Sequence, residues 1–76
     1  MNQNFKYICK SRTEDGKEHV CEFVPVGKEN WYVVSVSDFG VDVTQFFDDE
    51  DFNDVAFDYA RRFNLGKIFS LSKEMV

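Results

Sequence analysis

The chain has few of the side chains that usually carry out chemistry. Its 76 residues include one histidine, His19, and two cysteines, Cys9 and Cys21. A single histidine beside a turn is a weak candidate for a catalytic base, and a structural zinc site needs four ligands. The acidic run Asp48–Asp51 lacks the glycine and the bidentate glutamate of a calcium loop. We therefore expect a protein that is not an enzyme and that binds no metal and no cofactor.

Long apolar runs are missing as well. No stretch approaches the roughly 20 apolar residues that a membrane-spanning helix needs. Residues 1–6 also lack the basic flank and apolar run of a secretion signal. We expect a soluble protein of the cytosol, the host cell's cytosol if a phage encodes it, with both cysteines as reduced thiols.

Basic residues are absent from a long central segment. Residues 29–60 contain nine acidic side chains and no lysine or arginine. Residues 1–28 contain five basic and four acidic side chains, and residues 61–76 contain four basic and one acidic. The net charge of −5 therefore arises in the middle of the chain. Direct binding to nucleic acid is disfavoured, since lysine and arginine supply most contacts to phosphate.

Aromatic residues, by contrast, are plentiful: nine Phe, three Tyr and one Trp. A domain of this length buries only about 60% of the surface of its unfolded chain, so its stability margin is small. Each aromatic ring can bury roughly 150–250 Å². We expect residues 1–76 to form one domain with an aromatic core.

A turn near residue 15 predicts the first hairpin of an antiparallel sheet. Asp15-Gly16 lies between two alternating segments and favours a two-residue turn. A turn of that length gives these pairs: Lys10 with Cys21, Cys9 with Glu22, Ile8 with Phe23 and Tyr7 with Val24. Cys9 and Cys21 would then point to opposite faces of the sheet.

A second hairpin, through residues 27–30, pairs Val26 with Trp31 and continues the sheet. Both faces of this sheet are then partly apolar. One face carries Phe5, Tyr7, Val20, Val24, Val26, Trp31 and Val33. The other includes the residues of a candidate second interface: Ile8, Phe23, Tyr32, Val34 and Val36. Since one helix cannot cover both faces, the second is either covered by the segment after Val36 and the chain ends or free to bind a partner, including a second copy.

A helix follows a short strand expected at residues 41–44. Its apolar stripe repeats at the helical period and consists of Phe52, Val55, Ala56, Tyr59, Ala60 and Phe63. Asp48 or Asp49 is the expected N-cap, and Gly66 marks the expected end. Residues 67–72 alternate and predict a final strand. The predicted fold is α+β, with the order β-β-β-(β)-α-β: an antiparallel meander of three to four strands, one amphipathic helix on one face, and a C-terminal strand.

Acidic residues mark the helix start and the face opposite the apolar stripe. The set comprises Asp48, Asp49, Glu50, Asp51, Asp54 and Asp58. Two interpretations remain open: a solvated helix face whose first acids suit the helix dipole, or an array that imitates phosphates and binds a basic groove. Phe57 lies off the apolar stripe. Either it packs under residues 39–47 or it is an exposed aromatic anchor for a partner.

These features favour a non-enzymatic, acidic protein-interaction module. We expect a small inhibitor whose acidic helix region, with Phe57, acts as a nucleic-acid mimic and binds the basic surface of a nucleic-acid-handling protein. One concrete version is a phage or mobile-element protein that blocks a host nuclease or a CRISPR complex, which would make it an anti-CRISPR protein. The alternative is a structural or assembly module that homodimerises through the second apolar sheet face. We expect no contact with a membrane.

Overall fold

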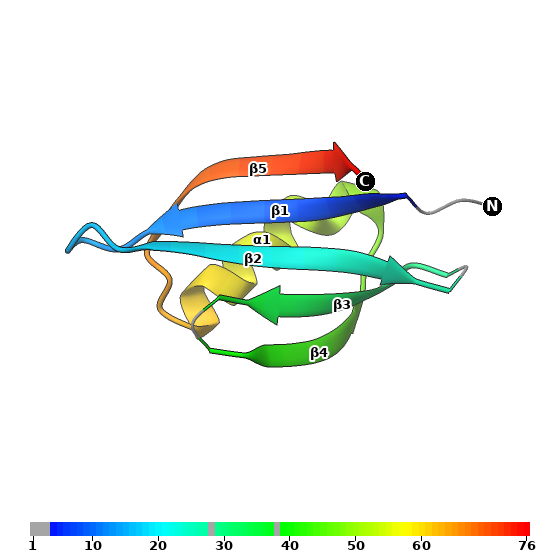
Figure 1. Ribbon diagram of the computed structural model, residues 1–76, viewed down its shortest axis with the longest axis horizontal. Coiled ribbons are helices and arrows are strands. Elements are labelled where there is room, and N and C mark those ends of the chain that lie inside the picture. The colour runs from blue at the N-terminus through cyan, green and yellow to red at the C-terminus, as the bar shows by residue number, and fades with distance from the viewer. Residues whose placement is uncertain (1–3, 28, 38) are drawn as a thin grey trace.

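The first four strands follow one another as antiparallel neighbours, and the last strand lies beside the first. The computed structural model describes residues 4–27, 29–37 and 39–76. Its elements are β1 (Phe5–Arg12), β2 (Glu18–Val26), β3 (Trp31–Val36), β4 (Val41–Phe46), the 3₁₀ turn η1 (Asp49–Asp51), α1 (Phe52–Arg62) and β5 (Lys67–Met75). The strands form one sheet in the order β4-β3-β2-β1-β5, and α1 lies across one face of it (Figure 1). The predicted α+β fold with a C-terminal strand is confirmed.

The hairpin between β1 and β2 has a three-residue loop instead of the expected two-residue turn. The Gly16 amide donates to the Thr13 carbonyl, and the Thr13 amide donates to the Lys17 carbonyl, both at 2.9 Å. Gly16 has φ 91°, the left-handed conformation that closes three-residue hairpin loops. The pairing therefore shifts by one residue, and Cys9 lies directly opposite Cys21. A shift of one residue moves β1 side chains to the other face relative to β2.

The observed register sorts the side chains of β1 and β2 by polarity. Tyr7 pairs with Phe23, Cys9 with Cys21 and Ser11 with His19, and alternation places all six on the face that α1 covers. The charged residues of the two strands share the other face: Lys6, Lys10, Arg12, Glu18 and Glu22. The predicted pairs between residues 7–10 and 21–24 are therefore wrong, and so is the predicted separation of the two cysteines. A two-residue turn would have placed some of these charges against the helix.

The core between the sheet and α1 is rich in aromatic residues. The β2–β3 pairs, including Val26 with Trp31, are the predicted ones. The helix stripe also forms as predicted, with Phe52, Ala56, Tyr59 and Ala60 buried and Val55 and Phe63 partly buried. Phe23 is fully buried, and its ring meets those of Phe47, Phe52 and Tyr59 edge-on at centroid distances between 5.4 and 5.8 Å. Edge-to-face pairs of this kind add stabilisation beyond the area they bury.

The helix begins and ends differently from the sequence prediction. Asp48 has the extended backbone of an N-cap before η1, but its side chain makes no capping hydrogen bond. At the other end, the Asn64 amide donates to the Arg61 carbonyl at 3.3 Å, and the Leu65 amide donates to the Ala60 carbonyl at 2.8 Å. Asn64 has φ 54°, which completes a Schellman motif. The residue that ends the helix is therefore Asn64 and not Gly66.

Gly66 has a different function, since it lets the chain cross the end of β1 closely. Its φ is 86°, and a Cβ at this position would overlap the backbone carbonyl of Arg12. From there β5 runs antiparallel to β1, with a register shift opposite Lys10 and Ser11. The shift leaves Phe69 as the extra residue of a β-bulge, a feature that hinders further pairing at a sheet edge.

Candidate protein-interaction surfaces

The predicted acidic residues of the helix do not share one environment. Asp58 forms two ion pairs within α1, with Arg61 Nη2 at 3.2 Å from its Oδ1 and Arg62 Nη2 at 2.6 Å from its Oδ2. These residues lie three and four positions along the helix, where side chains are neighbours. The C-terminal half of the exposed helix face therefore carries one acidic and two basic side chains, and Asp58 is not a free carboxylate.

Asp48 and Asp49 tie the start of the helix to the sheet. Asp49 Oδ1 accepts hydrogen bonds from the Tyr7 hydroxyl at 2.5 Å and the Tyr32 hydroxyl at 3.3 Å. Asp48 Oδ1 accepts one from Asn30 Nδ2 at 2.6 Å. Burial, together with the Asp49 carboxylate, raises the pKa of Tyr32 to about 12 and also raises the pKa of Tyr7. Both hydroxyls therefore stay protonated and remain donors at neutral pH.

Three carboxylates around the helix start make no such contact. Glu50, Asp51 and Asp54 are exposed, and their side chains form no hydrogen bond or ion pair with any described residue. Phe57 lies one turn after Asp54 and is 57% exposed. The interpretation that Phe57 packs under residues 39–47 is therefore wrong, and its exposure beside carboxylates is confirmed. We call Glu50, Asp51, Asp54 and Phe57 the acidic patch.

The predicted second interface lies mainly in the core. Phe23, Tyr32, Val34 and Val36 are at most 2% exposed and belong to the cluster under α1. These four residues cannot form an exposed interface in this fold, so that prediction is wrong for them. The physical reason is the register between β1 and β2. It places the charged side chains of both strands on the opposite face, so the face that carries Phe23 is free of them and packs against the helix. Ile8 does point to the opposite face, where its neighbours leave it 6% exposed.

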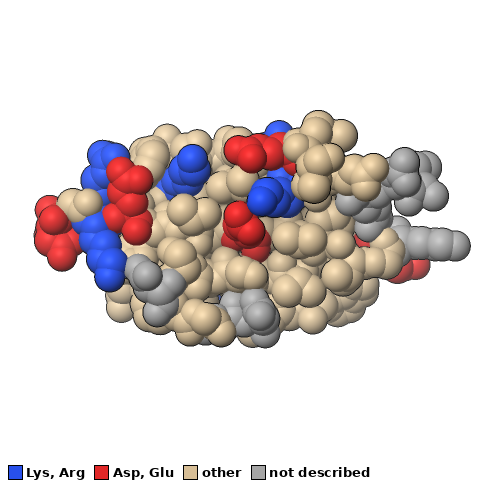
Figure 2. All heavy atoms as spheres, viewed as in Figure 1, with Lys and Arg blue, Asp and Glu red and all other residues tan. Residues whose placement is uncertain are grey.

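The sheet face away from α1 is open and carries an apolar patch that is not among the predicted interfaces. Val24, Val26, Trp31 and Phe46 are between 40% and 48% exposed, and the Trp31 and Phe46 rings meet edge-on at 5.3 Å. Val33 lies among them, directly opposite Val24. We call these five residues the open-face patch. Figure 2 shows uncharged surface over the C-terminal end of β2 and the adjoining part of β3, whereas charged side chains gather along β1, β5, the β1–β2 hairpin and the middle of β2.

The two cysteines, Ser11 and His19 are buried on the sheet face that α1 covers. Cys9 and Cys21 are free thiols, each 1% exposed, and burial raises their pKa values to about 12 and about 11. Ser11 lies directly opposite His19, but its hydroxyl has no hydrogen-bond partner in the described part of the chain. Within residues 4–27, 29–37 and 39–76, no three His, Cys, Asp or Glu side chains are placed to hold a metal ion. The thiols are therefore neutral and shielded at physiological pH.

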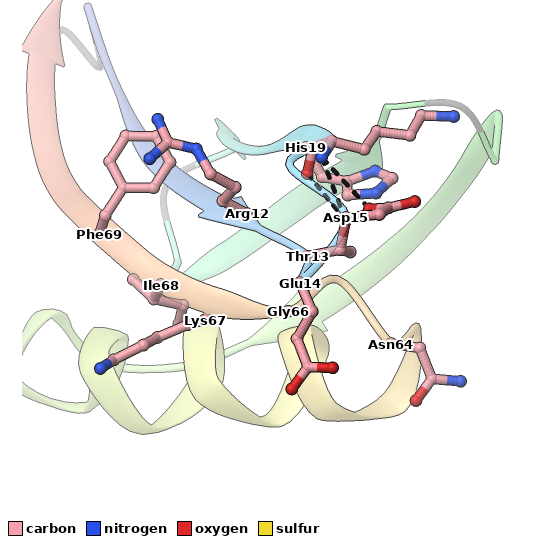
Figure 3. Close-up of a pocket in the computed structure, with 11 residues that line it drawn as sticks. Arg12, Thr13, Glu14, Asp15, His19, Asn64, Gly66, Lys67, Ile68 and Phe69 are labelled. Atoms are coloured by element: carbon pink, nitrogen blue, oxygen red, sulfur yellow. Dashed lines mark hydrogen bonds between the residues drawn. The ribbon is translucent and has the colours of Figure 1, made fainter.

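An open hollow of about 1250 Å³ lies between the β1–β2 hairpin and the start of β5. On one side, the Arg12 guanidinium lies over the Phe69 ring at 4.7 Å, and its Nη2 is 2.6 Å from Glu18 Oε2. Figure 3 shows the side chains of Glu14 and Lys67 pointing away from one another, not toward a common point. Glu14 and Lys67 therefore do not form a common binding point in this hollow.

Comparison of the chain with protein-family models, with curated proteins and with solved structures finds no match. Among the helical residues that the structure describes, none form a segment long and apolar enough to cross a bilayer. In the part of the chain that the structure describes, the acidic patch on the helix side and the open-face patch on the other side of the sheet are the candidate surfaces for a protein partner.

Proposed function

We propose that this chain is a non-enzymatic protein-interaction module that binds a basic protein surface through its acidic patch. One observation carries the proposal: Glu50, Asp51 and Asp54 lie exposed beside the exposed Phe57, in a segment of nine acidic residues without a lysine or arginine. An ordinary protein surface intersperses charges of both signs. A surface that carries only negative charge and includes an exposed aromatic side chain suits a positively charged partner.

The backbone that presents the patch is well supported. The bonds from Tyr7 and Tyr32 to Asp49 fix η1 against the sheet, and the patch begins at the next residue. Groups held on an ordered backbone lose less conformational freedom on binding. Arg61 and Arg62 mark the end of the acidic surface, because they neutralise Asp58.

The chemistry of the patch also favours one class of partner. Proteins that handle nucleic acid bind phosphates with lysine and arginine, and closely spaced carboxylates can occupy such a groove. The net charge of −5 adds long-range attraction toward a basic partner. In this proposal the chain acts as an inhibitor, and a phage or mobile-element protein directed at a host nuclease or CRISPR complex is its most specific form.

Phe57 gives the patch an exposed apolar side chain at its C-terminal end. An exposed aromatic ring next to charged groups resembles the anchor residues that contribute most of the binding free energy at protein interfaces. Phe57→Ala should therefore weaken binding while leaving its salt dependence unchanged, since the substitution removes no charge.

A charge-neutralising variant with a matched control tests the proposal. The test variant combines Glu50→Gln, Asp51→Asn and Asp54→Asn. The control combines Glu14→Gln, Glu29→Gln and Glu74→Gln, which gives the same net charge with the patch intact. The probe is a fluorescent arginine-rich peptide, titrated at low and high salt.

We expect the test variant to bind the peptide roughly 10-fold more weakly at low salt, because three exposed ion pairs contribute about 0.2–1 kcal/mol each. The difference should shrink at high salt. The control should lose much less affinity. Equal losses for the two variants would mean that net charge alone attracts the peptide, and the proposed site would be wrong.

A further inference from the structure

The open face is large enough for a stable contact between two proteins. The molecule measures 42 × 20 × 19 Å, and Figure 2 looks down the shortest axis onto this face. A standard protein interface buries about 800 Å² on each partner, roughly a sixth of the 5059 Å² that this chain exposes. An interface centred on the open-face patch therefore fits on the face, with charged side chains at its rim.

The charges around the patch are nearly balanced within the chain. The register of β1, β2 and β5 places seven charged side chains on this face, four basic and three acidic: Lys6, Lys10, Arg12, Lys67, Glu18, Glu22 and Glu74. Lys6 Nζ lies 3.3 Å from Glu22 Oε2, and Arg12 Nη2 lies 2.6 Å from Glu18 Oε2. The same face of another copy would consequently meet charges of both signs, with an excess of only one positive charge among these seven side chains.

The excess negative charge lies on the other side of the sheet, with α1. Two copies that met through their helix sides would bring their acidic patches together, and like charges in contact oppose association. Two copies that met through their open faces would keep these patches apart, with two sheets between them. The distribution of charge thus favours one mode of self-association over the other.

We propose that a second copy of this chain occupies the open face and that the protein is a homodimer packed sheet on sheet. A twofold axis in the plane of the interface brings the open-face patch of one copy against the same patch of the other. Antiparallel sheets pack face to face about 10 Å apart, with the strands of the two sheets within about 30° of each other. The two helices then form the outer layers. This inference is independent of the proposed function, although a dimer would present two acidic patches on opposite sides.

Trp31 provides a direct probe, because it is the single tryptophan of the chain and lies in the patch at 43% exposure. As the protein concentration increases, sedimentation equilibrium should show the average molecular mass rising from 8.9 kDa to about twice that value. The fluorescence of Trp31 should shift to shorter wavelength over the same concentration range, since the ring leaves water as the dimer forms.

Two substitutions of valine by glutamate separate the open face from the rest of the sheet. Val24 and Val43 are 40% and 39% exposed, but they point to opposite faces. Val24→Glu should raise the dimer Kd by about 30-fold or more, the equivalent of about 2 kcal/mol for an interface anchor. Val43→Glu should leave the Kd unchanged. If Val24→Glu fails to fold by circular dichroism, Val26→Lys at the end of β2 replaces it.

Three results would overturn the proposal. The first is a wild-type protein that stays monomeric at high micromolar concentration. The second is a dimer that Val24→Glu and Val26→Lys leave intact or that Val43→Glu dissociates equally. The third is a monomer whose Trp31 emission shifts only when lipid vesicles or another protein are added, which would assign the face to a different partner.

Discussion

Replacing Asp49 with alanine separates the carboxylates that hold the fold from those that are free to bind. Asp49 accepts hydrogen bonds from Tyr7 and Tyr32 where η1 meets the sheet. Asp51, two residues later, is exposed, and its side chain makes no hydrogen bond or ion pair with a described residue. Asp49→Ala and Asp51→Ala each remove one negative charge from the same turn. Their difference in stability therefore reports the tyrosine contacts of Asp49.

The geometry sets the size of this difference. A hydrogen bond to a charged acceptor contributes about 1.5–3 kcal/mol, and the 2.5 Å bond from Tyr7 belongs to this class. The 3.3 Å bond from Tyr32 contributes less. Because water reaches the Asp49 side chain, we expect a loss of about 2 kcal/mol for Asp49→Ala. Asp51→Ala loses a favourable charge at the helix start, which is about 0.3–1 kcal/mol.

Urea unfolding followed by circular dichroism measures both losses. The midpoint should fall further for Asp49→Ala than for Asp51→Ala, with the slope m unchanged. Tyr7→Phe in the wild type and in Asp49→Ala completes a double-mutant cycle, and a coupling of about 1 kcal/mol is expected. Equal losses for the two alanine variants and no coupling to Tyr7 would refute the structural assignment of Asp49 and return it to the acidic patch.

Two other properties follow from the packing. Gly66→Ala should destabilise the protein by about 2 kcal/mol more than Gly27→Ala in urea unfolding, because both residues have positive φ but a Cβ has room only at Gly27; equal losses would contradict the close crossing of β1. Stability should also fall as pH rises from about 9 toward 12. Cys9, Cys21 and Tyr32 have pKa values of about 12, 11 and 12 in the fold against ordinary values of 9.0, 9.0 and 10.0. A raised pKa stabilises the fold fully below the ordinary value and ceases to do so as pH rises through the folded value. Thermal melts across this range should therefore show a steady decline, and a flat profile would contradict the burial of these groups.

The local part of the fold was predictable because short-range patterns determine it. The apolar stripe of α1 repeats at the helical period, and the hairpin through residues 27–30 fixes Val26 opposite Trp31. The β1–β2 register was not predicted, because Gly16 can close either a two-residue or a three-residue loop. The charged residues of β1 and β2 could have decided between them, since only the three-residue loop places all of them on one face.

The acidic residues also divide into those with contacts close in sequence and those with contacts far apart along the chain. The pairing of Asp58 with Arg61 and Arg62 follows from their spacing along a helix and could have been predicted. The contacts of Asp49 could not, because Tyr7 and Tyr32 lie 42 and 17 residues away along the chain. Long-range packing therefore decides which carboxylates are structural and which are left for a partner.

The central claim is that two surfaces on opposite sides of one sheet serve two different contacts. Amide NMR spectra of the labelled chain test it directly, recorded once in a dilution series and once with the arginine-rich peptide added. Dilution should move the signals of the open-face patch: Val24, Val26, Trp31, Val33 and Phe46. The peptide should move those of the acidic patch: Glu50, Asp51, Asp54 and Phe57. Shifts of both kinds at the same residues, or shifts at neither patch, would contradict the account.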